Sequence, residues 1–275
     1  EVLRTIYLAQ SGEPFQRILP TMPLPWEVID AQGETPQSRR DDALARARDA
    51  ASRPFDLARD GSIRASLIRV APDSHLLCLV YHHIAIDGWS IAMLSKEFVQ
   101  AYNALLGGGT PDATAPELQI ADVAIWQNDT VSGQTLERQI DFWAQLLEGA
   151  PAVLDLPTDR PRPASQSFRG GNWSTRIPEP LYRKLESIAR ERRATMSMLV
   201  LAAFQILLSR YSGQEQVVVA AGTAGRTRLE LENVIGFFIN LLPLPLDLSD
   251  APSFLDALDR TRDAMLASMD NGDAP

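Results

Sequence analysis

Two adjacent histidines, with an aspartate and a glycine shortly after them, are the residues of this sequence best suited to chemistry. They lie in the run HHIAIDG, residues 82–88. Imidazole is the side chain best suited to move a proton near neutral pH. His83 is the first candidate, because it is the inner histidine and lies closer to the loop that carries Asp87. If His83 faces a cavity, it could accept a proton from an attacking amine or hydroxyl and later donate one to a leaving group.

The residues around His83 admit several roles. Asp87 could orient His83, cap a helix that starts near Gly88, or pair with a buried arginine, and the arginine pair is the favoured interpretation. The N–H of Gly88 would lie at a helix N-terminus and could bind a developing oxyanion, although a plain turn glycine fits the spacing equally well. His82 points away from His83 if the strand alternation persists, which favours a structural hydrogen bond.

Other chemistries find little support around the motif. Ser90 lies in the run DGWSIA, which lacks the GxSxG elbow of a serine nucleophile, so a capping hydroxyl is expected, and Trp89 is expected to pack. Adjacent histidines have diverging side chains and no third ligand follows at helix spacing, so no metal site is predicted. The sequence contains neither a P-loop nor GxGxxG. The motif therefore predicts acid–base chemistry without a covalent intermediate or a bound cofactor.

A strand and a helix must hold this loop. The apolar run at 76–81 predicts a strand before the histidines, and the apolar spacing from Ile91 to Leu105 predicts a helix after them. Strand pairs with helices between them predict an α/β fold with mixed sheets. The helix expected at 196–211 is apolar enough to be buried on most sides. The other expected strands are 2–8, 15–19, 26–29, 63–70, 172–177 and 216–221, and the other expected helices are 41–52, 136–147, 179–193 and 253–269.

Composition limits the class of protein. The chain has 275 residues, of which 45% are apolar, and a formal net charge of −9. This acidic balance argues against nucleic acid as a partner, because a phosphate-binding surface needs clustered Lys and Arg. No segment approaches the roughly 18 apolar residues of a membrane span, so no membrane association is predicted. Cys78 is the only cysteine and is expected to be a buried, inert thiol; without a signal peptide, a reducing cytoplasm is expected.

The domain organisation is predicted from one proline-rich segment. Residues 156–163 contain three prolines and are typical of an extended connector. We therefore expect an N-terminal lobe at 1–160, which carries the histidines, and the start of a C-terminal lobe at 161–275. The chain starts without Met inside a predicted strand and ends without a closing element, which suggests a piece of a longer polypeptide with elements of both lobes missing.

Taken together, these residues resemble the condensation domains of nonribosomal peptide synthetases. Residues 1–5 resemble the second half of the family's RHExLRT segment, and residues 82–90 read HHIAIDGWS, its active-site signature. Further matches occur in the family's order: PFDL at 54–57, a YxDxAxWQ element at 122–127, LPTDRPRP and SFRG at 156–163 and 167–170, and IGxFxN at 235–240. Several separate matches over the whole chain make the resemblance specific.

The resemblance implies the chloramphenicol-acetyltransferase-like fold, with two lobes and an active site in a tunnel between them. It also implies amide bond formation between an acyl or peptidyl thioester on an upstream carrier protein and the amine of an aminoacyl thioester on a downstream carrier protein. Both substrates would be held on phosphopantetheine arms, with no cofactor bound directly. An adenylation domain would be adjacent in a longer polypeptide.

The resemblance also implies roles for single residues. His83 would act as general base or position the amine, and Gly88 would lie by the reacting carbonyl. Asp87 would pair with Arg226, which closes the loop GTAGR where the family often has GTPIAGR. His82 would have a structural role beside them. The residues expected to line the channel are Trp89, Ser90 and Asn240.

Related functions fit the motif less well. Epimerization domains usually read HHxxxDGxSW, whereas here Trp89 precedes Ser90, and heterocyclization domains carry DxxxxD instead. Freestanding acyltransferases of the same fold use coenzyme A thioesters and need only HxxxDG. The alternatives that stay open are an epimerization domain and a non-catalytic domain that recruits partners. Degenerate relatives tend to lose the second histidine or the glycine, and this chain keeps both His83 and Gly88.

Overall fold

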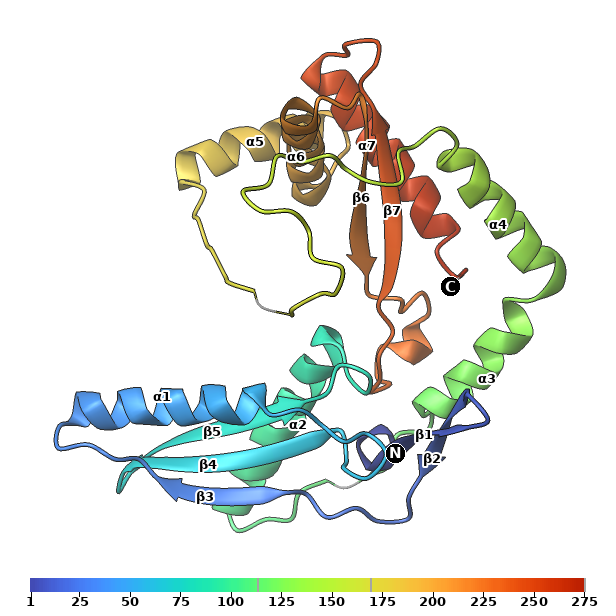
Figure 1. Ribbon diagram of the computed structural model, residues 1–275. Helices are drawn as coiled ribbons and strands as arrows, with labels where there is room; N and C mark the ends of the chain where they lie inside the picture. The colour runs from blue at the N-terminus through green and yellow to red at the C-terminus, as the bar shows by residue number, and fades with distance from the viewer. Residues whose placement is uncertain (113, 169, 275) are drawn as a thin grey trace. The chain divides into compact units, whose positions relative to one another are not determined.

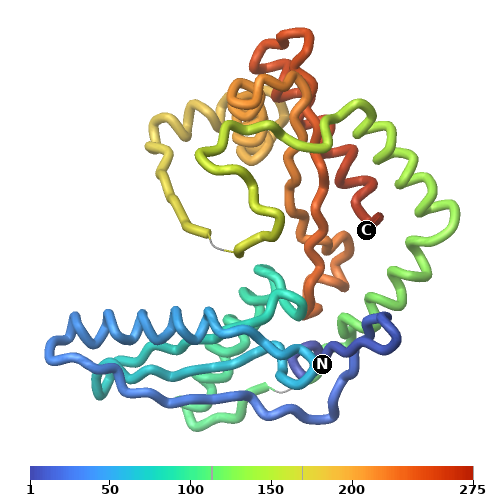
Figure 2. Tube along the Cα trace, in the orientation of Figure 1, coloured from blue at the N-terminus to red at the C-terminus, as the bar shows by residue number. Residues whose placement is uncertain are grey.

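The computed structural model describes residues 1–112, 114–168 and 170–274 and divides the chain into two compact units (Figure 1). Unit 1 contains Glu1–Asp129 and Arg226–Ile239, and unit 2 contains Thr130–Gly225 and Asn240–Pro275. The chain thus leaves unit 1 and later returns to it for residues 226–239, which we call the return segment. Figure 2 lets the reader follow this course along the Cα trace.

The sheet of unit 1 that leads to the histidines has three strands in the order β3-β4-β5. β3 and β4 are parallel, and β4 and β5 form an antiparallel hairpin. A parallel pair needs a crossover connection, which helix α1 (Pro36–Ser52) supplies. Ala43 of this helix packs with Ile68 of the sheet, where the small side chain allows close approach. The strands are β3 (Trp26–Asp30), β4 (Ile63–Ala71) and β5 (Ser74–Tyr81).

A separate antiparallel hairpin, β1 with β2, lies near the start of unit 1. Its turn residues Ser11 and Gly12 have φ of 53° and 89°, positive as the two-residue hairpin turns require. Helix α2 starts directly after the histidine loop. The remaining elements of unit 1 are η1 (Val2–Arg4), β1 (Thr5–Gln10), β2 (Glu13–Ile18), α2 (Gly88–Leu106), α3 (Ile120–Thr130) and η2 (Leu229–Leu231).

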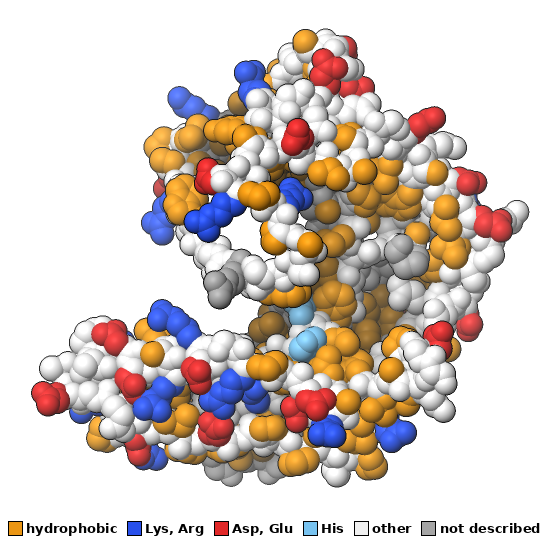
Figure 3. Space-filling view, viewed as in Figure 1, with side chains coloured by type: hydrophobic (Ala, Val, Ile, Leu, Met, Phe, Trp, Pro, Cys, Tyr) orange, Lys and Arg blue, Asp and Glu red, His pale blue; other side chains and the backbone are white. Residues whose placement is uncertain are grey.

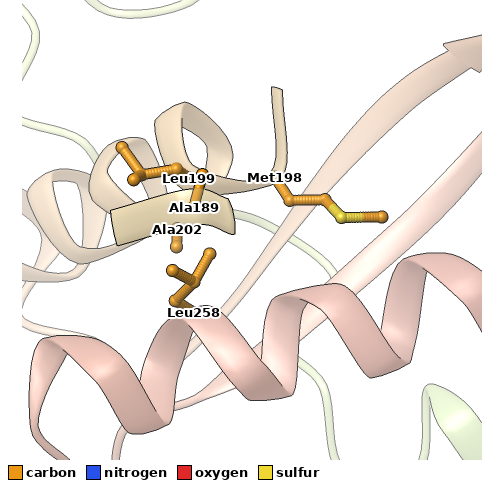
Figure 4. Close-up of a cluster of buried hydrophobic side chains, with 5 residues drawn as sticks. All are labelled: Ala189, Met198, Leu199, Ala202 and Leu258. Carbon is orange, nitrogen blue, oxygen red and sulfur yellow. The ribbon is translucent and has the colours of Figure 1, made fainter. Parts of the chain in front are cut away.

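Unit 2 contains one antiparallel strand pair and four helices among its described residues. Along β7, Leu242, Leu244 and Leu246 are 4%, 1% and 2% exposed, so alternate side chains face the interior. Figure 4 shows Leu258 of α7 pointing toward Ala202 of α6 in the core. The elements are α4 (Gly133–Leu146), α5 (Glu179–Glu191), α6 (Met196–Ser212), β6 (Gln216–Thr223), β7 (Asn240–Asp247) and α7 (Phe254–Asp270).

Two expectations about local structure were wrong. Residues 172–177 form no regular strand, and Trp173 within them is 87% exposed, so this segment has no buried face to stabilise it. Helix α6 lies where predicted but is not buried on most sides, because Val200, Phe204 and Leu207 are 45%, 46% and 48% exposed. Apolar composition predicts that a helix contributes to a core, but not how many of its faces are covered.

The two compact units divide the chain differently from the expected lobes. The first division falls at 129/130, and the proline-rich residues 156–163 lie inside unit 2, where they form no helix or strand.

Cys78 is partly exposed rather than buried. The arginine of the SFRG segment, Arg169, lies outside the described residues. Over the described ranges, no single helix is long and apolar enough to cross a membrane, while α5 and α6, bent by 99°, meet the criterion only as a pair.

Candidate active site

The hydrogen bond of His83 fixes which of its ring nitrogens carries the proton. Nδ1 of His83 lies 2.7 Å from the carbonyl oxygen of Ile86. A carbonyl oxygen can only accept a hydrogen bond, so Nδ1 must carry a hydrogen and donate it. In the neutral ring, the lone pair then resides on Nε2, and His83 itself is exposed. Nε2 of His83 can therefore accept a proton from a molecule that binds at this exposed side chain.

His82 faces a different environment from its neighbour. Its Nδ1 accepts a hydrogen bond from the N–H of Ile84 at 3.0 Å. Its ring meets Phe55 edge to face, with centroids 5.7 Å apart, and its backbone N–H donates to Ser62. The two imidazoles thus diverge at the end of β5, as strand alternation predicts, and His82 holds the loop against the 54–57 segment. Histidine side chains are visible at the molecular surface in pale blue in Figure 3.

Asp87 caps helix α2 and pairs with an arginine at the same time. Its Oδ1 accepts from the N–H of Ser90 at 2.8 Å, and its Oδ2 accepts from Nη1 of Arg226 at 2.7 Å and from the N–H of Phe238 at 3.1 Å. The hydrogen bond of His83 goes to Ile86 rather than to Asp87. Of the roles weighed for Asp87, the structure therefore shows the cap and the arginine pair.

The ionisation of Asp87 is controlled by opposing effects. Burial raises the pKa of the carboxyl, because it disfavours the charged form, but the hydrogen bonds from Arg226 and from the N–H groups of Ser90 and Phe238 lower it. The hydrogen bonds prevail, so the pKa of Asp87 lies below its ordinary value. A charged carboxylate can therefore persist in this buried position.

Ser90 does not line open space, contrary to the expectation for it. The residue is fully buried at 0% exposure. Its Oγ donates to the carbonyl oxygen of Gly236 at 2.9 Å and accepts from the N–H of Gly236 at 3.1 Å and from Nη2 of Arg226 at 2.8 Å. The hydroxyl is thus saturated and joins the first turn of α2 to the return segment.

Arg226 opens the return segment and is enclosed by it. Besides Asp87 and Ser90, its Nη2 donates to the carbonyl oxygen of Val234 at 3.1 Å. Its guanidinium lies 4.2 Å from the ring centre of Phe238 and 5.7 Å from that of Trp89. Trp89 is 46% exposed, so part of its ring stays open. Its Nε1 donates to the carbonyl oxygen of Glu232 at 3.0 Å, which fixes the indole to the return segment as well.

Gly88 is the first residue of α2, directly after its cap. The N–H groups of the first helical turn have no acceptor within the helix, and they carry the positive end of the helix dipole. Gly88 is exposed, and a Cβ placed on it would have no neighbour within 4 Å. The absent side chain therefore leaves free surface at the start of α2, on the same short loop as His83.

Asn240 is the first residue of the part of unit 2 that follows the return segment. Its Nδ2 donates to the carbonyl oxygens of Gly272 and Ala274 at 2.8 and 3.0 Å. Together with Trp143 and Leu241 it lines a hollow of about 520 Å³ within that unit. The amide thus ties the start of β7 to the residues that follow α7.

Two residues that contribute to the site were not singled out from the sequence. Phe237 meets the ring of His83 edge to face, with centroids 5.1 Å apart and planes at 88°. Gly236 lies so close to Ile120 of α3 that an added Cβ would be 2.7 Å from its Cδ1. Both fall in the segment 235–240 that resembles the IGxFxN motif, which was the available signal. Among the described residues, no group of three or more His, Cys, Asp or Glu could hold a metal ion.

Comparison with solved structures identifies the class of fold. The chain matches the first condensation domain of the calcium-dependent antibiotic synthetase over its whole length, with a TM-score of 0.79 at 24% identity. It matches the X-domain from teicoplanin biosynthesis, solved in complex with OxyB, with a TM-score of 0.89 at 30% identity. The chain covers 63% and 60% of those two structures. These matches confirm the α/β chloramphenicol-acetyltransferase-like fold.

The chain belongs to the Condensation domain family, whose profile matches residues 1–275. It is 42% identical over 275 residues to one of the linear gramicidin synthase proteins of Brevibacillus parabrevis, of which it covers 4%. It is 35% identical to phosphinothricin tripeptide synthetase PhsC of Streptomyces viridochromogenes, of which it covers 25%. The resemblance to condensation domains of nonribosomal peptide synthetases is thereby confirmed, and the chain spans a small part of the length of these relatives.

Proposed function

We propose that the chain takes part in amide bond formation between two carrier-bound substrates. The donor is an acyl or peptidyl thioester on an upstream carrier protein, and the acceptor is the amine of an aminoacyl thioester on a downstream one. Substrates of condensation domains in nonribosomal peptide synthetases are carried on the phosphopantetheine of carrier proteins. The reacting group supplied by this chain is His83.

The observation that carries the proposal is the orientation of the His83 ring. Its Nδ1–H is engaged by Ile86 at 2.7 Å, which leaves Nε2 as the basic nitrogen on an exposed side chain. A buried imidazole packed in apolar residues could not reach a substrate, and His83 is not in such a position. General bases need this combination of a free lone pair and access to the attacking group.

The proposed reaction conserves atoms and protons. The acceptor amine attacks the thioester carbonyl carbon, a C–N bond forms, and Nε2 of His83 accepts the amine proton. The C–S bond then breaks, and the departing thiolate takes the proton from the imidazolium. The carbonyl oxygen carries negative charge in between, and the N–H of Gly88 at the start of α2 is available to donate to it.

Asp87 and Arg226 serve this site without exchanging protons with the substrate in our proposal. Both side chains are 1% exposed, so neither can contact a ligand directly. Their ion pair and the Ser90 hydrogen bonds fix the start of α2, and thereby the loop 82–88. We therefore propose that His83 and Gly88 act on the reacting atoms. The buried side chains of Asp87, Ser90 and Arg226 hold the loop that carries them.

A second candidate is a domain that recruits another protein without catalysis. It is favoured by the similarity to the teicoplanin X-domain, which was solved as a complex with OxyB. The open lone pair of His83 favours catalysis instead, because a recruiting surface does not require it. Epimerization of a carrier-bound substrate would also use a base, but it yields no new amide.

The test is mass spectrometry of the products formed from loaded donor and acceptor carrier proteins by the synthetase polypeptide that contains this chain. We expect an amide product, and we expect His83→Ala to reduce its rate of formation by about 10² or more. His75→Ala is the matched control, since His75 is an exposed histidine on β5. Near wild-type turnover in His83→Ala would overturn the proposal. An epimerised donor without an amide would replace it with the epimerization alternative.

A further inference from the structure

The return segment brings one aromatic ring against the proposed base. Phe237 contacts the His83 ring edge to face, with centroids 5.1 Å apart and ring planes at 88°. The imidazole is hydrogen-bonded through its Nδ1–H to Ile86, at 2.7 Å. The imidazole of His83 can still rotate about this single hydrogen bond, and such a rotation moves Nε2. The ring of Phe237 packed against the imidazole restricts that rotation.

Phe237 is held between two anchored neighbours. The N–H and the carbonyl oxygen of Gly236 both bond to Oγ of Ser90, at 3.1 and 2.9 Å. On the other side, the N–H of Phe238 donates to Asp87 at 3.1 Å. Ser90 and Asp87 are 0% and 1% exposed, so both anchors are buried and shielded from competing water.

The return segment is also held from its other side. Gly236 approaches Ile120 of α3 so closely that a Cβ would not fit. Val234 packs with Val123 and Leu231 in a buried cluster. Phe237 itself is 44% exposed, although its neighbours are fixed. Because its backbone neighbours are fixed by hydrogen bonds and packing, the exposed ring of Phe237 can hold the exposed imidazole of His83 in place.

We infer that Phe237 is a positioning residue for His83. Its ring holds the imidazole of His83 so that Nε2 is directed at the incoming amine. The inference rests on the proposed function, in which His83 is the base. Phe237 acts through the imidazole ring. Its edge-to-face contact, worth a modest energy, corresponds to about a two- to tenfold change in kcat when it is lost.

The first measurement reports on the imidazole and does not depend on turnover. Long-range ¹H–¹⁵N spectra of the imidazoles report which ring nitrogen carries the proton, and the His83 signals are identified as those that disappear in the His83→Gln variant. The wild-type protein should show His83 with its proton on Nδ1. Phe237→Leu should shift the His83 signals and mix the two tautomers, and Phe237→Tyr should restore the wild-type spectrum because it keeps the ring.

The matched control is Phe98→Leu, which removes a ring of similar exposure, 47% against 44%, from the middle of α2. It should leave the His83 signals and kcat unchanged. Phe237→Leu should lower kcat by about two- to tenfold with little change in KM and thermal midpoint, and Phe237→Tyr should recover kcat. If Phe237→Leu has a lowered thermal midpoint, Phe237→Met replaces it in both measurements.

Two results would overturn the inference. One is a Phe237→Leu spectrum in which the His83 signals move no more than in Phe98→Leu. The other is a changed spectrum with an unchanged kcat, because His83 would then need no positioning by this ring. Failure of the proposed function is recognised separately, as a wild-type protein that forms no amide or a His83→Ala variant that forms it at the normal rate.

Discussion

The carboxylate of Asp87 and the guanidinium of Arg226 lie 2.7 Å apart although 139 residues separate them in the chain. Both side chains are 1% exposed. Their pairing joins the cap of α2 to the first residue of the return segment. A buried ion pair adds little compared with apolar residues of the same shape, but removal of one partner leaves an uncompensated charge. Loss of either partner should therefore weaken the fold more than loss of an exposed ion pair does.

Asp87→Ala should destabilise the fold more than it harms chemistry. Loss of one partner of a buried pair costs about 3–5 kcal/mol in the free energy of unfolding, which urea denaturation measures. Asp250→Ala is the control, because Asp250 pairs with Arg260 while its side chain is 60% exposed. That variant should unfold at nearly the wild-type urea concentration. Equal midpoints for Asp87→Ala and wild type would contradict the prediction.

The stability of the protein should fall at acid pH in a way that depends on Asp87. Although burial opposes its ionisation, hydrogen bonds from Arg226, Ser90 and Phe238 hold the pKa of Asp87 below its ordinary value of 3.8. The folded state therefore binds this proton more weakly than the unfolded state does. The stabilisation is fully present well above pH 3.8, begins to decline as the pH approaches 3.8, and is lost once the pH passes the folded pKa.

The check for this pH dependence is the difference in unfolding free energy between wild type and Asp87→Asn as a function of pH. The difference should be constant from neutral pH to about pH 5 and should shrink in the acid range below it. A difference that keeps the same size through the acid range would show that the charge of Asp87 does not stabilise the fold.

Gly88→Ala should separate folding from chemistry. A Cβ at this position meets no atom within 4 Å, and the N–H is retained, so the thermal midpoint should not change. Amide formation should fall by about tenfold or more, since a methyl group would crowd the surface beside His83 and displace the substrate. Gly236→Ala is the opposite case, because its Cβ would meet Ile120 at 2.7 Å and the midpoint should drop. Unchanged turnover in Gly88→Ala would argue that the reaction does not occur at this surface.

Ser90→Ala should destabilise the protein by about 1–3 kcal/mol, measured by urea denaturation. The substitution leaves the buried N–H and carbonyl oxygen of Gly236 without the hydroxyl that bonds both. Ser95→Ala is the control in the same helix, since the exposed Ser95 hydroxyl bonds back to Ile91 at 2.7 Å. That variant should be as stable as wild type or slightly more so. Equal stability of the two variants would show that the Ser90 hydroxyl does not hold the return segment.

Much of the local structure around the site could be predicted from the sequence. The apolar run at 76–81 became β5 (Ser74–Tyr81), and the apolar spacing after Gly88 became α2 (Gly88–Leu106). These predictions succeed because side-chain periodicity and capping residues act over a few neighbouring positions. The strand expected at 172–177 did not form, because a strand also needs a partner strand and a buried face, and neighbouring positions in the sequence do not provide these.

The histidine pair, the loop that carries it and the family of the chain were all evident from the order of the amino acids. The burial of Ser90, the free Nε2 of His83 and the packing of Phe237 on its ring became evident only in the folded chain. Those features depend on residues 226–239 returning to α2 from a distant part of the chain. Hydrogen bonds and ring contacts of that kind form between groups that are close in space, and periodicity along the sequence carries no record of them.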